Sequence, residues 1–231
     1  MISTLRRNPL ILIVVNPCME KFHLDNRDPC AYLQIMAGLF VFAVGIVFLL
    51  KSDLGMGPWD VFHVGIKDHV PLTLGRVNQI VGFTIIVASC FLHIYPGIGT
   101  LLNMIFIGLF IDAINPYVPF GDDYFFQTAL LACGVILIGI GSGLYINANL
   151  GAGPRDSLML GLSRKTGKSI RLVRNSMEIT VLIIGFFLGG PVGVGTVAFA
   201  VAIGPSVHFF LKIIPERGKR NGNLKQRDGN K

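Results

Sequence analysis

The sequence predicts an all-α polytopic membrane protein with six transmembrane helices. We expect two inverted three-helix repeats, each containing a broken or re-entrant short helix. Three observations predict this fold. The 231 residues are 52% hydrophobic and only 14% charged, whereas soluble domains carry about 25% charged residues. Six segments are long and apolar enough to cross about 30 Å of hydrocarbon. An internal repeat relates the first three of these segments to the last three.

The six spans are expected at residues 31–50, 77–95, 99–117, 128–148, 173–189 and 194–213. The fifth is the least apolar, because it contains Arg174 and Glu178. Pro205 should kink the sixth. The predicted domains are a cytoplasmic or interfacial extension (1–30), the first membrane repeat (31–120), the second membrane repeat (121–214) and a basic cytoplasmic tail (215–231).

The repeat has a constant offset of 96 residues and needs no gap. Gly38 falls on Gly134, and the stretch "LGMGPWD" that begins at Leu54 falls on "LGAGPRD" at Leu150. Further along the chain, "GIGT" falls on "GVGT". Three spans per copy force the second copy into the opposite orientation, so the repeat is predicted to be inverted.

The placement of basic residues predicts the topology. Residues 164–174 contain five positive and no acidic residues, and the tail from Lys212 contains seven positive and two acidic residues. Two spans separate these segments, so both can be cytoplasmic. We therefore expect a multi-pass membrane protein with both termini in the cytoplasm. Basic residues that flank apolar spans do not indicate nucleic-acid binding.

The break after the first span is predicted to begin a short helix. Residues 58–67 are too few to cross a bilayer. Gly57 is expected at the N-cap, Pro58 at the first helical position and Asp60 at the third, where an acid complements the positive helix end. The second copy repeats this entry with Gly153, Pro154 and Asp156.

Two roles remain open for Asp60 and Asp156. Each aspartate can simply complement a helix N-terminus, or it can bind a cation or carry a proton. The second role follows from the pairing, because inverted repeats with interrupted helices place substrate and ion sites at the repeat interface. Arg155 replaces Trp59 in the second copy, so Arg155 would favour an acidic or zwitterionic group and Trp59 an apolar or cationic one.

Other polar residues also have two interpretations. Arg174 and Glu178 are four residues apart and favour an ion pair on one helix face. Thr100 and Thr196 follow "GxG" and either line a second helix break or cap the next helix. The predicted substrate- or ion-binding set is Gly55, Gly57, Trp59, Asp60, Thr100, Gly151, Gly153, Arg155, Asp156, Arg174, Glu178 and Thr196.

Nothing in the sequence predicts a cofactor, a metal site or an enzyme. The four cysteines form no CxxC pair. "GIGT" and "GVGT" lack the lysine of a nucleotide-binding loop. No Ser/His/Asp or paired-acid constellation has the spacing of a known catalytic motif.

The motifs "LGMGPWDVFHVGI", "GIGTLLN", "LGAGPRDSLMLGL", "RLVRNSMEI" and "VGVGTVAFAVAIGP" together resemble the YczE/YitT-like family of bacterial integral membrane proteins, and its YczE branch in particular. The resemblance covers roughly residues 31–213. It implies a bacterial cytoplasmic-membrane protein with several helices, and no functional residues are carried over from it.

The sequence therefore predicts a small transporter for a small polar metabolite, anionic or zwitterionic, with its site between the two GxGPxD segments. The expected partners are the lipid bilayer, that solute and a second copy of the chain, because six spans enclose little volume. The alternative is a non-transporting membrane protein with a regulatory or partner-anchoring role.

Overall fold

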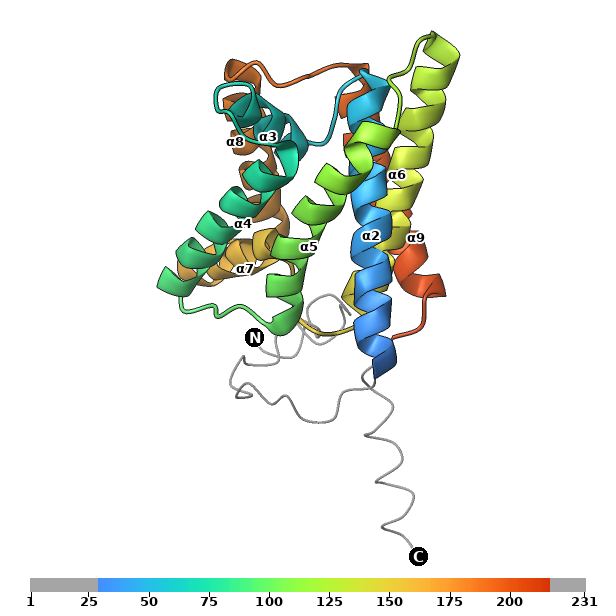
Figure 1. Cartoon of the computed structure of the whole chain (residues 1–231). Helices are drawn as coiled ribbons and strands as arrows, with labels where there is room; N and C mark the ends of the chain where they lie inside the picture. Colours follow the sequence, from blue (N-terminus) through green and yellow to red (C-terminus); the bar gives the residue numbers. More distant parts are fainter. Residues whose placement is uncertain (1–28, 217–231) are drawn as a thin grey trace, which may run out of the picture.

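The computed structural model describes residues 29–216. The predicted N-terminal extension and most of the predicted basic tail lie outside these residues. Within them the chain forms eight α-helices, one short 3₁₀ helix and no strand (Figure 1). The elements are α2 (Pro29–Ser52), α3 (Pro58–Lys67), α4 (Leu74–Phe91), α5 (Ile98–Ile114), η2 (Asn115–Tyr117), α6 (Tyr124–Asn147), α7 (Pro154–Thr166), α8 (Ile170–Phe187) and α9 (Val194–Ile213).

Five of these elements are long and apolar enough to cross a membrane: α2, α4, α5 continued by η2, α6 and α9. Each of the six predicted spans coincides with a helix, but α8 is not among the five. Arg171, Arg174 and Glu178 place three charged side chains in its 18 residues. The all-helical membrane architecture is thus confirmed, and the fifth predicted span, at α8, stays a prediction.

The sequence repeat reappears in the helix boundaries. Helices α4 and α8 begin and end 96 residues apart, and α3 and α7 begin at Pro58 and Pro154. Two residues that precede the short helices, Asp53 and Asn149, both adopt positive φ, at 54° and 56°. Positive φ is uncommon outside glycine, and asparagine and aspartate tolerate it best. The repeated residues therefore produce the same chain path twice.

Helices α2 and α6 run in opposite directions and pack closely along their length (Figure 1). A Cβ added at Gly45 would lie 2.9 Å from the Gly134 carbonyl oxygen, and one added at Gly141 would lie 2.8 Å from that of Gly38. Small residues allow such close backbone approach between membrane helices. Gly134 and Gly141 are the copies of Gly38 and Gly45, so each glycine contacts the copy of the other.

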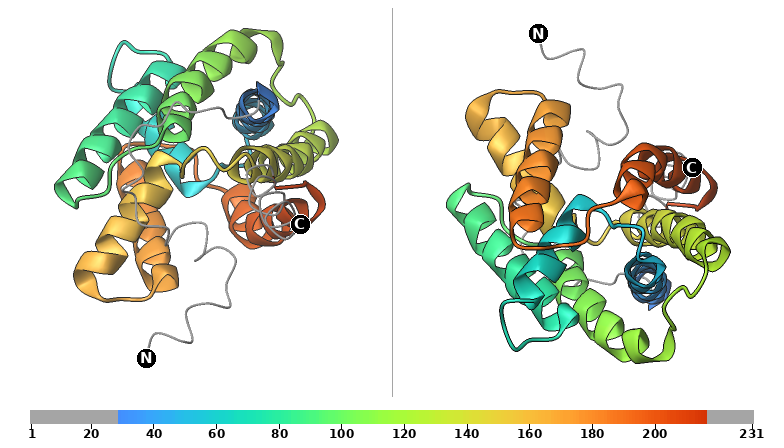
Figure 2. Two further views of the ribbon diagram at one scale, coloured as in Figure 1. Left: turned by 90° about the horizontal axis from the view of Figure 1, so that it is seen from below. Right: turned by 90° about the horizontal axis from the view of Figure 1, so that it is seen from above.

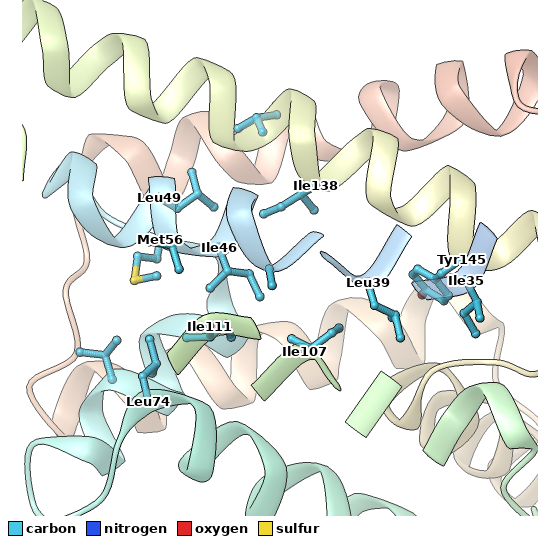
Figure 3. Packing of buried hydrophobic residues seen from close by; sticks show 14 of the residues in the cluster. Ile35, Leu39, Ile46, Leu49, Met56, Leu74, Ile107, Ile111, Ile138 and Tyr145 are labelled. Carbon is cyan, nitrogen blue, oxygen red and sulfur yellow. The ribbon is translucent and has the colours of Figure 1, made fainter. Parts of the chain in front are cut away.

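The buried apolar core lies along this helix pair. Figure 3 shows Ile35, Leu39, Ile46 and Leu49 of α2 directed at Ile107 and Ile111 of α5 and at Ile138 and Tyr145 of α6. Ile35, Leu39 and Leu49 have no exposed surface. Fully buried side chains of this kind fix the relative positions of α2, α5 and α6.

The helices form two groups, and each group contains both copies of its members (Figure 2). In the first group α2 packs against α5 and α6, and α6 packs against α9. In the second group α3 packs against α8 and α4 packs against α7. The segments before α3 and α7 cross between the groups, which places the start of each short helix in the middle of the molecule (Figure 2).

The two groups are joined unequally. Helix α4 packs against α5, with Gly75 against Gly108, and Asp112 Oδ1 accepts a hydrogen bond from the Gly75 N–H at 2.8 Å. The copies of these helices, α8 and α9, form no comparable contact and lie apart in Figure 2. Arg171 stands where Gly75 would be, and a Cβ at Gly204 would meet nothing within 4 Å. In this structure the second pair therefore lacks the close glycine contact that joins the first pair.

Candidate functional site

Helices α3 and α7 begin as the sequence predicted. Gly57 and Gly153 are the N-caps, each with an extended backbone, and a proline follows each of them. Asp60 and Asp156 lie in the first turns. Because glycine has no side chain, neither N-cap residue can make a side-chain capping hydrogen bond. The start of each helix therefore rests on backbone geometry and on the acid in its first turn.

Gly55 and Gly151 turn the chain just before these helices. Their φ angles are +109° and +136°, which glycine adopts readily and L-residues avoid. At Gly55 a Cβ would also lie 2.6 Å from Thr196 Oγ1 and 2.7 Å from the Gly193 nitrogen. These two predicted site glycines are thus required by backbone conformation, and Gly55 also by a close approach from the other half of the chain.

Each break docks on the "GxGT" turn of the other half. The Gly195 N–H donates to the Leu54 carbonyl at 2.7 Å, and the Gly99 N–H donates to the Leu150 carbonyl at 2.9 Å. Leu150 and Gly195 are the copies of Leu54 and Gly99, so the two bonds are equivalent under the 96-residue offset. This exchange of contacts brings the two short helices together.

Thr100 and Thr196 hold this docking in place. Each hydroxyl accepts the N–H of the glycine three residues earlier, Gly97 at 3.2 Å and Gly193 at 3.3 Å. Thr100 also donates to the Ala152 carbonyl. Both side chains are buried. The capping interpretation of the two threonines is therefore confirmed.

The first turns of α3 and α7 meet in the middle of the molecule. The Arg155 guanidinium carbon lies 4.8 Å from the centre of the Trp59 ring, within the range of a cation–π contact. Arg155 is also within electrostatic range of Asp60 and Asp156. Both Trp59 and Arg155 are half-buried. The four predicted residues Trp59, Asp60, Arg155 and Asp156 thus form one cluster, in which Arg155 itself takes the cation-binding face of Trp59.

The two aspartates have different neighbours. Asp60 Oδ1 lies 3.9 Å from Nδ1 of His63, and the Asn78 amide nitrogen lies 3.3 Å from the same ring nitrogen. By contrast, Asp156 Oδ2 accepts a hydrogen bond from the Tyr145 hydroxyl at 3.3 Å. The copy of His63 is Met159, which cannot play the same part, so the site is asymmetric.

Sequence reasoning did not identify His63, Asn78 or Tyr145 as members of the site. His63 follows Asp60 by three residues, a spacing that places both on one face of a helix. The sequence alone could therefore have identified His63 as a neighbour of Asp60. Asn78 and Tyr145 are brought in by the packing of α4 and α6, which no local pattern reports.

Arg174 and Glu178 form the ion pair that the sequence favoured. Arg174 Nε lies 3.0 Å from Glu178 Oε1, and the Arg174 side chain is 57% exposed. Arg174 is within electrostatic range of Asp156. The pair therefore borders the central cluster on α8, on the side where α8 and α9 do not pack together.

Within residues 29–216, no group of three or more His, Cys, Asp or Glu side chains is placed to hold a metal ion. An apolar hollow of about 340 Å³ lies elsewhere, lined by Phe48, Tyr117, Val118, Pro119, Phe126, Ala129, Leu130 and Cys133. Its lining is apolar, and it contains none of the predicted site residues.

Comparison with known proteins gives the chain a family. It is 42% identical over 177 residues to "Uncharacterized membrane protein YczE" of Bacillus subtilis, covering 76% of this chain and 82% of the relative. It is 37% identical over 180 residues to an "Uncharacterized protein" of Haemophilus influenzae, covering 78% and 83%. A third relative, "Uncharacterized protein YyaS" of Bacillus subtilis, is 22% identical over 187 residues, covering 79% and 93%.

No solved structure matches the chain. The model of a family of unknown function, DUF6198, matches residues 30–212. That match spans all eight described helices except the ends of the first and last. The resemblance to YczE-like membrane proteins is confirmed, and the chain belongs to this family.

Proposed function

We propose that the chain is a small transporter built from two inverted three-helix halves, with its site between the first turns of α3 and α7. One observation carries the proposal: two short helices from opposite halves meet at Trp59 and Arg155, each with a carboxylate in its first turn. Helix N-termini that converge from interrupted segments are the usual way in which transporters build a substrate site near the membrane midplane.

The inverted arrangement is supported by two reciprocal contacts and by the helix boundaries. The glycines of α2 and α6 contact one another's copies, the docking bonds at Leu54 and Leu150 are equivalent, and α3 and α7 begin 96 residues apart. Such reciprocity is expected of two halves related by a pseudo-two-fold axis. With α8 as the sixth span, the proposed topology places both termini in the cytoplasm of a bacterial cell.

The helix groups meet at two joints, the α4–α5 pair and the α8–α9 pair, and we propose that these joints open and close during transport. Helices α4 and α5 are closed on one another, whereas α8 and α9 are apart. In our proposal the two pairs exchange these states, so that the central cluster faces first one side of the membrane and then the other. Alternating access by rocking of one bundle against another is typical of transporters with internal repeats.

The solute is proposed to be small and polar, with a zwitterionic compound as the best fit. Asp60 and Asp156 would face its cationic group and Arg155 its acidic group. The proposal includes no cofactor and no catalytic step. A second copy of the chain in the membrane is a further expectation.

Uptake by proteoliposomes tests this function. The purified protein is reconstituted and given a mixture of radiolabelled amino acids as zwitterionic probes, with empty liposomes as the blank. We expect wild-type uptake, with at least a tenfold loss in Asp60→Asn and Asp156→Asn. Asp68→Asn is the matched control, because Asp68 is exposed and pairs with Lys67 away from the cluster. Normal uptake in both cluster variants would contradict the role given to these acids.

One observation favours the non-transporting alternative. The apolar hollow of about 340 Å³ lies between α2, η2 and α6, and not between α3 and α7. A regulatory or partner-anchoring protein needs no solute path at the centre. Absence of uptake for every probe in the mixture, with the protein correctly folded, would support this alternative.

A further inference from the structure

Three residues of the first half form a buried polar group with no counterpart in the second. Asp60, His63 and Asn78 are 6%, 2% and 9% exposed. The Asn78 amide lies against Nδ1 of His63, so Nε2 carries the proton of a neutral ring. Nε2 is buried and has no hydrogen-bond partner among the described residues. A buried polar atom without a protein partner is costly and requires an explanation.

The charges around this group do not balance. Asp60, Asp156 and Glu178 supply three carboxylates, and Arg155 and Arg174 supply two guanidinium groups that interact with them. His63 is neutral, so one negative charge has no compensating partner in the cluster. An excess charge at membrane depth is expensive, and binding a proton removes it.

The surroundings identify which carboxylate takes the proton. Glu178 is paired directly with Arg174 at 3.0 Å. Asp156 accepts a hydrogen bond from Tyr145 and lies near Arg174 as well. Asp60 has only Arg155 as a charged neighbour, which it shares with Asp156. Its Oδ1 faces the neutral imidazole of His63 at 3.9 Å. Helix α4 places the neutral amide of Asn78 against the same imidazole.

A proton fits this place better than a metal ion does. A metal ion requires several oxygen, nitrogen or sulfur ligands, and the described residues contain no group of three or more His, Cys, Asp or Glu side chains placed to hold one. A carboxylate beside an imidazole needs only water as its source of protons. Chains of acidic residues and histidines carry protons in membrane pumps and transporters.

We propose that Asp60 and His63 form a proton-binding site whose loading accompanies solute movement. One proton passes from water to the Asp60 carboxylate and returns to water when the carboxylate becomes charged again. On loading, an O–H bond of hydronium breaks as an N–H bond forms on His63, and that N–H bond then breaks as the Asp60 O–H bond forms. Release runs these steps in reverse and leaves His63 neutral. The coupling to solute rests on the transport function proposed above, whereas the proton site itself does not.

Infrared difference spectroscopy tests the site without any solute. Protein in lipid bilayers is brought from acidic to alkaline pH, and the carbonyl stretch of a protonated carboxyl group is followed. We expect a pH-dependent band that Asp60→Asn removes and Asp156→Asn keeps. Asp60→Glu should retain a band at shifted frequency. His63→Gln should move the midpoint of the band, whereas His69→Gln, at an exposed histidine, should not.

The opposite pattern would overturn the proposal. A band that survives in Asp60→Asn, or that disappears in Asp156→Asn, would place the proton elsewhere. Circular dichroism and size-exclusion profiles confirm that each variant is folded. The band is measured independently of uptake, so a band at Asp60 without transport would contradict the proposed function and leave the proton site standing. Uptake without a band from Asp60 would contradict the proton site and leave the proposed transport function standing.

Discussion

The α4–α5 pair and the α8–α9 pair derive from the same repeated sequence, yet only the first is closed. In the closed pair Gly75 lies against Gly108, and Asp112 accepts hydrogen bonds from the Gly75 N–H and the Thr73 hydroxyl. The copies of Gly75 and Asp112 are Arg171 and His208, and both are exposed. A repeat can therefore preserve helix boundaries while a few residues decide which helices pack.

The difference also shows which contacts stabilise the closed pair. Backbone contact through glycine needs a position without a side chain, and the carboxylate adds two hydrogen bonds. The second pair lacks both features. We expect substitutions in the first pair to matter, and the same substitutions in the second pair to matter little.

The largest effect is expected from Gly108→Ala. A methyl group there would clash with the Gly75 carbonyl oxygen and with the side chain of Gln79. Overpacking of this kind costs about 1–3 kcal/mol, so the apparent free energy of unfolding in detergent should fall by that amount. Thermal unfolding followed by circular dichroism measures it.

Gly204→Ala is the matched control for Gly108→Ala. Its methyl group would meet nothing within 4 Å, and alanine favours a helix over glycine by about 1 kcal/mol. This variant should be unchanged or slightly more stable. Equal destabilisation of the two variants would mean that α8 and α9 are also packed in the membrane.

A smaller effect is expected from Asp112→Ala. The change leaves the Thr73 hydroxyl and the Gly75 N–H without their acceptor, at a cost of about 1–2 kcal/mol. His208→Ala, at the equivalent and exposed position, should stay within about 0.5 kcal/mol of wild type. A larger loss in the histidine variant would reverse our ranking of the two joints.

The smallest effect separates the two threonines. Thr100→Val loses the bond to the Ala152 carbonyl and the cap of the Gly97 N–H, together about 1–2 kcal/mol. Thr196→Val loses the cap of the Gly193 N–H, about 1 kcal/mol. Chemical denaturation of both variants in the same detergent gives the difference. Equal losses would show that the Thr100–Ala152 bond adds nothing to the docking.

Local chemistry made part of this molecule predictable. The Gly-Pro-x-Asp spacing gave the starts of α3 and α7, since N-caps and first-turn residues act within one turn of helix. The spacing of Arg174 and Glu178 gave their ion pair for the same reason. Offset matching required only the sequence, and the helix boundaries follow that offset.

Tertiary packing made the rest unpredictable. The contact of Arg155 with Trp59 depends on two breaks docking on opposite halves, and no local pattern places them together. Tyr145 reaches Asp156 only because α6 leads into the segment before α7. The 96-residue offset shows that Arg171 is the copy of Gly75. That this difference affects helix packing appears only in the structure, where Gly75 of α4 contacts Gly108 of α5.

The exchange between the two joints is tested most directly by distances between spin labels. Gln79 and Ile105 are in contact across α4 and α5, with 2.8 Å between the Gln79 amide nitrogen and the Ile105 carbonyl oxygen. Their copies, Asn175 and Val201, are exposed on α8 and α9. After replacement of the four native cysteines, one label pair is introduced at each joint and measured by double electron–electron resonance in bilayers.

Our account predicts that the 175–201 pair shows a long distance together with a shorter component that matches the 79–105 pair. Gly108→Ala should enlarge that short component and lengthen the 79–105 distance, because in our proposal the two joints exchange states. A single long distance between residues 175 and 201, unchanged by Gly108→Ala, would contradict alternating closure and leave a permanently asymmetric protein.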